Sequence, residues 1–261
     1  MKISFSKYHG TGNDFILVDN RMIHWEPTVQ QVASLCDRHF GIGADGLMLL
    51  SLSSGFDYAM TYYNSDGNES TLCGNGGRCM TAFARSLGLI ERSAHFRAVD
   101  GSHAAEISGT GAGSSYRIKM KDTQIGKIYG DGVFIDTGSP HFVKFVQDAA
   151  QTDVFNSGKA LRHDARFTPG GANIDFVEVQ PDALFVRSYE RGVEDETLSC
   201  GTGVTASALA AAAANHPHQG FYNIKTLGGS LKVSFIQAGE RFTDIWLEGP
   251  ATFVFKGEIE I

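Results

Sequence analysis

Hydrophobic and polar residues alternate along this chain in short runs, which glycine, aspartate and proline residues separate. Runs of this kind predict β-strands at residues 15–19, 47–52, 58–63, 176–179 and 184–189. The spacing of apolar residues predicts helices at residues 29–38, 79–87 and 204–215. The third helix is almost entirely alanine, and a helix that is apolar on every side is normally buried. We therefore expect strands of its own half of the chain to surround it.

Short sequence matches recur at a nearly constant distance along the chain. Cys73 and Cys200, which are 127 positions apart, open the related stretches Cys-Gly-Asn-Gly and Cys-Gly-Thr-Gly. Further matches pair residues 11–15 with 137–142, 43–45 with 171–173, 63–64 with 189–190, and 101–102 with 229–230. A constant offset over five landmarks predicts two homologous halves, which we place at residues 1–124 and 125–249.

Composition and charge exclude several classes of function. The 42% hydrophobic and 20% charged residues are typical of a soluble globular protein. A net charge of −7 argues against nucleic acid or an anionic membrane surface as the partner. No apolar run is long enough for a membrane span, and the first residues lack the apolar segment of a signal peptide. We therefore expect a cytoplasmic protein with reduced thiols.

The four cysteines differ in what surrounds them. Their spacing fits no common zinc motif, so we expect no metal site. Cys36 and Cys79 are expected in the core. Cys73 and Cys200 each follow an acidic turn and precede a predicted helix, whose positive end lowers the pKa of a thiol. The glycines that follow allow close approach of a ligand, and the free N–H groups can hold a carboxylate.

Two such motifs at equivalent places suggest chemistry, although a single one is equally typical of a small buried cysteine. Thiols that face each other across an approximate two-fold axis can act on opposite faces of one carbon, as a racemase or epimerase requires. Glu190 and Arg191 add the two charges that suit the ammonium and carboxylate of an amino acid. His141 lies at a repeat landmark and is a candidate supporting residue.

The glycine string at residues 41–46 matches the dinucleotide fingerprint G-x-G-x-x-G. That fingerprint requires a strand before it and a helix after it. Here a predicted helix precedes the string and a predicted strand follows it, which is the reverse order. We therefore expect no nucleotide site.

The motifs together resemble those of diaminopimelate epimerase over nearly the whole chain. The resemblance is carried by five stretches: His-Gly-Thr-Gly-Asn-Asp-Phe at 9–15, Asn-Ser-Asp-Gly at 64–67, Cys-Gly-Asn-Gly-Gly-Arg-Cys at 73–79, Tyr-Glu-Arg-Gly at 189–192 and Glu-Thr-Leu-Ser-Cys-Gly-Thr-Gly at 196–203. It implies an α/β (α+β) fold of two pseudo-symmetric halves. Each half is a β-barrel-like sheet around a central helix, residues 250–261 return to the first half, and the active site lies in the cleft.

The resemblance also implies the reaction. Members interconvert LL- and meso-diaminopimelate for lysine and peptidoglycan synthesis, with no cofactor, and relatives form homodimers. Cys73 and Cys200 would be the catalytic thiols. The residues expected to contact substrate are Asn13, Asn64, Gly74, Asn75, Asn173, Glu190, Arg191, Gly201 and Thr202. Gly46 and Ser139 replace a Gln and an Asn that many members carry, and one extra residue lies between Arg191 and Cys200.

Four alternatives remain open at this point. Proline racemases and hydroxyproline epimerases resemble this chain in the cysteine pair but not in the Gly-Asn-Asp-Phe and Tyr-Glu-Arg-Gly stretches. Isomerases of the phenazine-biosynthesis type share the fold but lack the two cysteines. A non-catalytic amino-acid binding protein would bind without α-proton exchange. A Cys-His hydrolase using His141 would leave the second motif unexplained.

Overall fold

The computed structural model describes residues 1–261 apart from the side chain of residue 112. The chain forms two compact units, one of residues 1–118 and 249–261 and the other of residues 119–248. Residues 119–124, which we assigned to the first half, therefore lie in the second unit. The reason is local pairing: the Met120 N–H donates to Ile245 O, and Thr123 pairs with Phe242.

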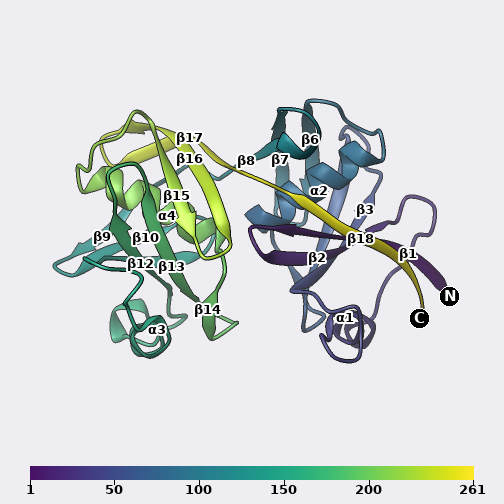
Figure 1. Ribbon diagram of the computed structural model, residues 1–261, viewed down its shortest axis with the longest axis horizontal. Coiled ribbons are helices and arrows are strands. Elements are labelled where there is room, and N and C mark those ends of the chain that lie inside the picture. The colour runs from purple at the N-terminus through teal and green to yellow at the C-terminus, as the bar shows by residue number, and fades with distance from the viewer. The chain divides into compact units, whose positions relative to one another are not determined.

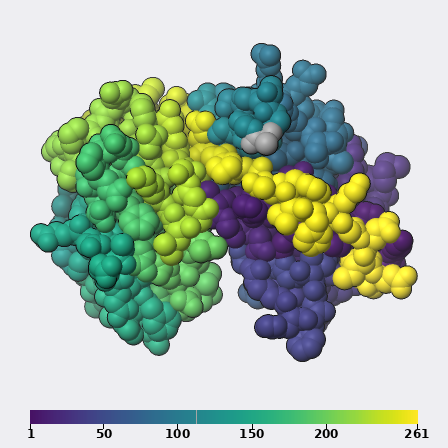
Figure 2. All heavy atoms as spheres, in the orientation of Figure 1, coloured from purple at the N-terminus to yellow at the C-terminus, as the bar shows by residue number. Residues whose placement is uncertain are grey.

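The first unit places a nearly buried helix against a curved sheet (Figure 1). Its strands are β1 (Lys2–Gly10), β2 (Asn13–Asp19), β3 (Gly46–Ser51), β4 (Tyr58–Asn64), β5 (Glu69–Ser70), β6 (Ser93–Ala98), β7 (Gly101–Ser108), β8 (Ser115–Lys119) and β18 (Thr252–Glu260). Its helices are α1 (Val29–Cys36), α2 (Gly74–Ser86) and the short η1 (Gly111–Gly113). Strand β18 pairs with β1 and lies on the surface in yellow (Figure 2).

The second unit repeats this plan and closes its sheet into a barrel. Its strands are β9 (Thr123–Tyr129), β10 (Gly132–Asp136), β11 (Pro140–Phe145), β12 (Asn173–Val179), β13 (Leu184–Glu190), β14 (Asp195–Thr197), β15 (Phe221–Thr226), β16 (Gly229–Ala238) and β17 (Arg241–Gly249). Its helices are α3 (Val154–Arg162), η2 (Ala165–Phe167) and α4 (Gly201–Ala213). Pairing of β9 with both β10 and β17 completes a ring of eight strands.

The repeat is visible in strand register as well as in sequence. In the first unit β2 runs parallel to β3 with Phe15 opposite Gly46, and in the second β11 runs parallel to β12 with Phe142 opposite Ile174. The turn glycines Gly101 and Gly229 both have positive φ, at 126° and 143°. The predicted fold class and internal duplication are therefore confirmed.

The predicted strands are all present, and the helices differ mainly where they begin. Helices α2 and α4 begin at Gly74 and Gly201, directly after the cysteines, whereas the pattern placed them several residues later. Glycine disfavours a helix interior, so apolar spacing missed these first turns. Helix α4 is buried on nearly all sides among apolar residues of its own unit, as expected, and Asn215 ends it with a φ of 60°.

Candidate functional site

Cys73 caps the N-terminus of α2. Its backbone is extended, as at other N-caps, and its Sγ accepts the N–H of Gly76 at 3.5 Å. The side chain is half-buried. A Cβ on Gly76 would lie 1.9 Å from Cε of the buried Met48, so any larger residue at this position of the first turn would require the Met48 side chain to move. The sulfur therefore faces the positive end of a helix with backbone donors around it.

Asparagine side chains surround Cys73. The Sγ lies 3.6 Å from Oδ1 of Asn13, and the amide of Asn75 donates to the same oxygen at 3.2 Å. The Asn13 amide donates in turn to Asp45 at 2.7 Å. The structure thus brings Asn13, Gly74 and Asn75 together with Cys73.

Asn64 stands at the half-buried end of β4, where its N–H donates to Asn68 O at 2.9 Å. Within the described residues its side chain makes no hydrogen bond to Cys73 or Asn13. Gly46 is its partner across β3 and β4. A Cβ on Gly46 would lie 2.5 Å from Tyr63 O and 2.6 Å from the ring of Tyr62, so the chain has no room for a Gln here.

Cys200 is the N-cap residue of α4, with an extended backbone like that of Cys73, but it is buried. Its Sγ lies 3.5 Å from the hydroxyl of Thr202. Burial first, and then the charges of Glu190 and Asp175, raise the pKa of Cys200 well above the usual thiol value. Hydrogen bonds from Thr202 and from the Gly203 N–H oppose this shift without overcoming it. The expectation that the helix N-terminus lowers the thiol pKa is therefore wrong for Cys200, because desolvation dominates.

A buried chain of hydrogen bonds leads away from Cys200. His141 Nδ1 lies 2.7 Å from Asp175, and its Nε2 lies 2.9 Å from the hydroxyl of Thr202. The side chains of His141 and Asp175 have no exposed surface. Ser188 donates to the other oxygen of Asp175 at 2.6 Å. Because Asp175 accepts from Nδ1, the ring is held with its Nε2 directed at Thr202. The Thr202 hydroxyl thus lies between the imidazole of His141 and the sulfur of Cys200.

The remaining predicted residues of the second unit gather near the same helix. The Asn173 amide donates to Ser139 Oγ at 2.8 Å and its oxygen accepts the N–H of Arg191, also at 2.8 Å. Glu190 accepts from the hydroxyl of Thr197. Burial raises the pKa of Glu190, although Thr197 and His141 favour its ionised form. The Arg191 side chain is exposed and remains available to an anion.

Two buried side chains near the cysteines escaped the sequence analysis. Asp175 lies directly before the strand predicted at 176–179 and was not considered, although an acid between apolar residues is itself a signal that it has a buried partner. Arg78, which has no exposed surface, was read only as part of the cysteine motif. Cys36 and Cys79 are buried as expected, and burial raises the pKa of each to about 12.

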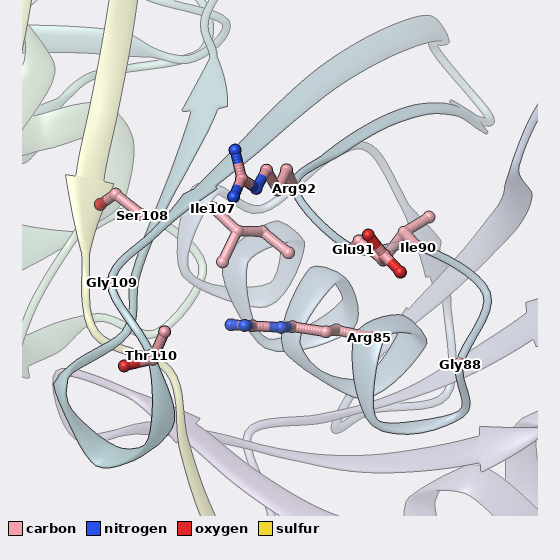
Figure 3. Close-up of a pocket in the computed structure, with 9 residues that line it drawn as sticks. All are labelled: Arg85, Gly88, Ile90, Glu91, Arg92, Ile107, Ser108, Gly109 and Thr110. Carbon is pink, nitrogen blue, oxygen red and sulfur yellow. The ribbon is translucent and has the colours of Figure 1, made fainter.

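A separate cavity of about 700 Å³ lies at the C-terminal end of α2 (Figure 3). The side chains of Arg85 and Arg92 extend into it on either side of Ile107. None of the predicted site residues lines it. Within the part of the chain that the structure describes, no three His, Cys, Asp or Glu side chains are placed to bind a metal, and no helix could cross a membrane.

Comparison with known proteins reveals close relatives. The family model described as diaminopimelate epimerase matches residues 5–122 and 133–254. A diaminopimelate epimerase of Flavobacterium psychrophilum is 48% identical over 255 residues, covering 97% of this chain and 98% of the relative. One of Chlorobaculum tepidum is 41% identical over 258 residues, covering 97% and 99%.

Solved structures share the fold at low sequence identity. A phenazine biosynthesis protein of the PhzF family from Bacillus anthracis has a TM-score of 0.80 at 17% identity, covering all of both chains. A hydroxyproline epimerase from Agrobacterium vitis has a TM-score of 0.72 at 15% identity, covering 99% and 92%. The chain thus belongs to the diaminopimelate epimerase family, whose members are isomerases that act on an amino acid.

Proposed function

We propose that this chain interconverts LL- and meso-diaminopimelate with Cys73 and Cys200 as the two acid–base groups and without a cofactor. The observation that carries the mechanism is the matched placement of the two thiols. Each is the N-cap of a 13-residue helix whose first and third residues are glycine. Each therefore combines a sulfur with backbone donors suited to an anion. Lysine and peptidoglycan synthesis is the corresponding role.

In the proposed step, the substrate α-carboxylate accepts hydrogen bonds from backbone N–H groups at a helix N-terminus. One cysteine, as thiolate, takes the α-proton and becomes a thiol. The other, as thiol, gives its proton to the opposite face of the carbon and becomes a thiolate. The protonation states of the pair are thus exchanged after each turnover, so the two sulfurs titrate as one coupled system.

The acidity of the α-C–H is the main energetic problem. With no electron sink, negative charge that spreads onto the carboxylate has to be stabilised by fixed donors. One preorganised N–H donor in a dry site contributes about 3 to 4 kcal/mol. A positioned acid or base contributes roughly 10²- to 10⁴-fold in rate. The glycines at Gly74, Gly76, Gly201 and Gly203 support this role, because they let the donors approach the substrate closely.

We assign the other end of the amino acid to the polar residues near each helix. Asn13, Asn64 and Asn75 serve from the first unit, and Asn173, Thr202 and Glu190 from the second. Arg191 is the carboxylate partner because its exposed guanidinium can bind both oxygens. His141 supports Cys200 through Thr202.

We further propose a cytoplasmic homodimer that binds no nucleic acid. The exposed strand β18 supports the dimer, because three consecutive apolar residues, Phe253, Val254 and Phe255, are 50%, 50% and 44% exposed. Exposed apolar residues that cluster in this way, rather than singly, are typical of an interaction site. Sedimentation of the chain and of Val254→Lys tests this: a wild-type monomer at micromolar concentration would exclude it.

Proton exchange tests the reaction itself. The purified chain is incubated with LL-diaminopimelate in heavy water, with no added cofactor, and the products are followed by NMR. We expect meso-diaminopimelate to accumulate with deuterium at the inverted α-carbon, because the donating thiol exchanges with solvent. Product that keeps its original α-proton would indicate a single-base route and contradict the proposal. Proline and hydroxyproline, tested in parallel, should show no exchange.

A further inference from the structure

We propose that Arg78 is a positioning residue for Cys73, whose buried guanidinium orients the amides beside the sulfur and supplies the positive charge that makes Cys73 the resting thiolate. The inference rests on the two-thiol function above and deepens it. It assigns the resting base to Cys73 and the resting acid to Cys200.

Arg78 is a buried cation surrounded by neutral groups. Its side chain has no exposed surface, and within the described residues it makes no ion pair with an Asp or Glu. Its hydrogen bonds go to Gly74 O at 3.4 Å, Asn75 Oδ1 at 2.9 Å, Thr11 Oγ1 at 3.5 Å and Pro250 O at 3.3 Å. A charge removed from water without a counter-charge is strongly unfavourable, so this site favours a nearby anion.

Cys73 is the group that can provide this anion. The other sulfur near Arg78 is Cys79, which keeps its proton because burial raises its pKa to about 12. Burial lowers the pKa of Arg78 to about 10, so the guanidinium remains charged at neutral pH.

The other titratable groups on the strands packed against α2 have partners or stay neutral. Lys7 pairs with Asp14, Arg38 with both Asp14 and Asp45, His103 with Asp100, and Arg117 with Glu106. His9 accepts the N–H of Gly12, and burial raises the pKa of Tyr8. Since these groups are accounted for, the uncompensated charge near the α2 N-terminus is that of Arg78.

Arg78 also fixes how the amides around the sulfur point. Because its guanidinium donates to Asn75 Oδ1, the Asn75 amide must donate to Asn13, whose own amide donates to Asp45. This order turns the Asn13 oxygen toward Cys73, a contact that only the thiol form can use. The Sγ lies 3.6 Å from that oxygen, an ordinary distance for a thiol hydrogen bond, so this amide favours the thiol while the charge of Arg78 favours the thiolate.

The second unit provides an internal control for a purely structural role. Thr205 lies at the position of α4 that corresponds to Arg78, and its hydroxyl donates to Gly201 O at 2.9 Å. A neutral hydroxyl in α4 therefore makes the hydrogen bond to the first residue of the helix that the Arg78 guanidinium makes in α2. Beside Cys200 stand instead the carboxylates Glu190 and Asp175, which oppose a thiolate. The two helices thus place unlike charges beside equivalent sulfurs.

The test is the pH dependence of alkylation of each sulfur by iodoacetamide, followed by peptide mass spectrometry. Cys73 is measured in a Cys200→Ser background and Cys200 in a Cys73→Ser background. We expect the midpoint for Cys73 to lie below that for Cys200. Replacing Arg78 by Met in the Cys200→Ser background should raise the Cys73 midpoint by about one pH unit or more, the usual effect of losing an adjacent opposite charge. Arg78→Lys should restore most of the shift.

The matched control is Arg85→Met, which removes a positive charge from the far end of the same helix, beside the cavity in Figure 3. This variant should leave the Cys73 midpoint unchanged. If Arg78→Met and Arg78→Lys reduce turnover without moving the midpoint, Arg78 is only structural and the proposal is overturned. If Arg78→Met does not fold, the comparison of the two unmodified sulfurs decides: a lower midpoint at Cys200 overturns it.

The alkylation midpoints do not depend on turnover. A chain with the expected midpoints but no α-proton exchange would sustain the role of Arg78 and remove the proposed reaction. A chain that exchanges the α-proton but has its lower midpoint at Cys200 would sustain the proposed reaction and overturn the role of Arg78.

Discussion

The first turns of α2 and α4 share a backbone but differ in charge. Both helices have 13 residues, a cysteine as N-cap, and glycine at the first and third positions. The fifth residue of α2 is the fully buried Arg78, and the fifth residue of α4 is the buried, neutral Thr205. Two equivalent thiols can therefore enter a reaction cycle in different protonation states. The duplicated fold places the two thiols at equivalent positions, and the side chains beside them differ in charge.

The surroundings of the two helices differ in how they hold buried acids. In the first unit, Asp14 is neutralised by Lys7 at 2.7 Å and by Arg38 at 2.8 Å. In the second unit, the corresponding place is taken by His141, which bonds to the fully buried Asp175. In the first arrangement Lys7 pairs with Asp14, and Arg38 pairs with both Asp14 and Asp45. In the second arrangement Asp175 lies next to the imidazole of His141, and the charge of Asp175 contributes to the raised pKa of Cys200.

The largest effect should come from removing either sulfur. We expect Cys73→Ala and Cys200→Ala each to lose between roughly 10² and 10⁴ in turnover, because each removes a general acid in one direction and a general base in the other. Turnover is measured with LL-diaminopimelate, and substrate binding by calorimetry. Binding should survive, since the helix N–H groups remain.

Cys36→Ala is the matched control, because Cys36 is a buried thiol of the first unit outside the candidate site. It should retain most of its turnover. A cysteine variant at position 73 or 200 that keeps more than a tenth of wild-type turnover would show that the equivalence of the two helices is not catalytic.

A smaller effect is expected from Asp175→Asn. The amide can no longer accept from both His141 and Ser188, so the imidazole changes tautomer and Thr202 loses its orientation toward Cys200. We expect a stability loss of about 1 to 3 kcal/mol. We also expect turnover to fall by between about tenfold and 10²-fold, the scale of a misplaced reacting group. Urea unfolding and steady-state kinetics measure the two effects.

Asp131→Asn provides the comparison, because the same substitution in the same unit breaks an exposed ion pair with Arg166. Such pairs contribute about 0 to 1 kcal/mol. If Asp175→Asn resembles Asp131→Asn in both stability and turnover, the buried chain from Asp175 to Cys200 plays no part in the reaction.

Much of the fold could be predicted because the repeat consists of short local sequence patterns. The alanine-rich run identified α4 as a buried helix, and the two cysteines marked equivalent helix starts. The helix boundaries were less accessible, because the glycines of each first turn are poor helix formers that close packing requires. Gly203 shows this: a Cβ there would lie 2.4 Å from an oxygen of Asp175.

The charge difference between the two helices could not be predicted from the sequence. Arg78 and Asp175 were visible as residues, but their burial and partners depend on contacts between segments far apart in the chain. Arg78 bonds to Pro250, and Asp175 bonds to both His141 and Ser188. The pKa of Cys200 follows from such contacts, and the helix dipole alone gave the opposite direction.

The smallest predicted effect concerns acid stability and separates the two units. Burial would raise the pKa of Asp14, but hydrogen bonds from Arg38 and Lys7 outweigh it and lower the pKa to about 2 from a usual value of 3.8. A depressed carboxyl pKa contributes stability above the unfolded value. That stability is lost as the pH falls from about 4 toward about 2, and a shift of nearly two units corresponds to about 2 kcal/mol.

Asp14→Asn should therefore destabilise the first unit by about 2 kcal/mol at neutral pH, and the difference from wild type should vanish near pH 2. The chain has two tryptophans, Trp25 in the first unit and Trp246 in the second. Urea unfolding in a Trp246→Phe background follows the first unit through Trp25, and Trp25→Phe allows the reverse. An equal, pH-independent loss reported by both tryptophans would mean that Asp14 acts through packing. A loss confined to Trp25 and removed by acid would show that the first unit depends on paired ions where the second depends on its imidazole.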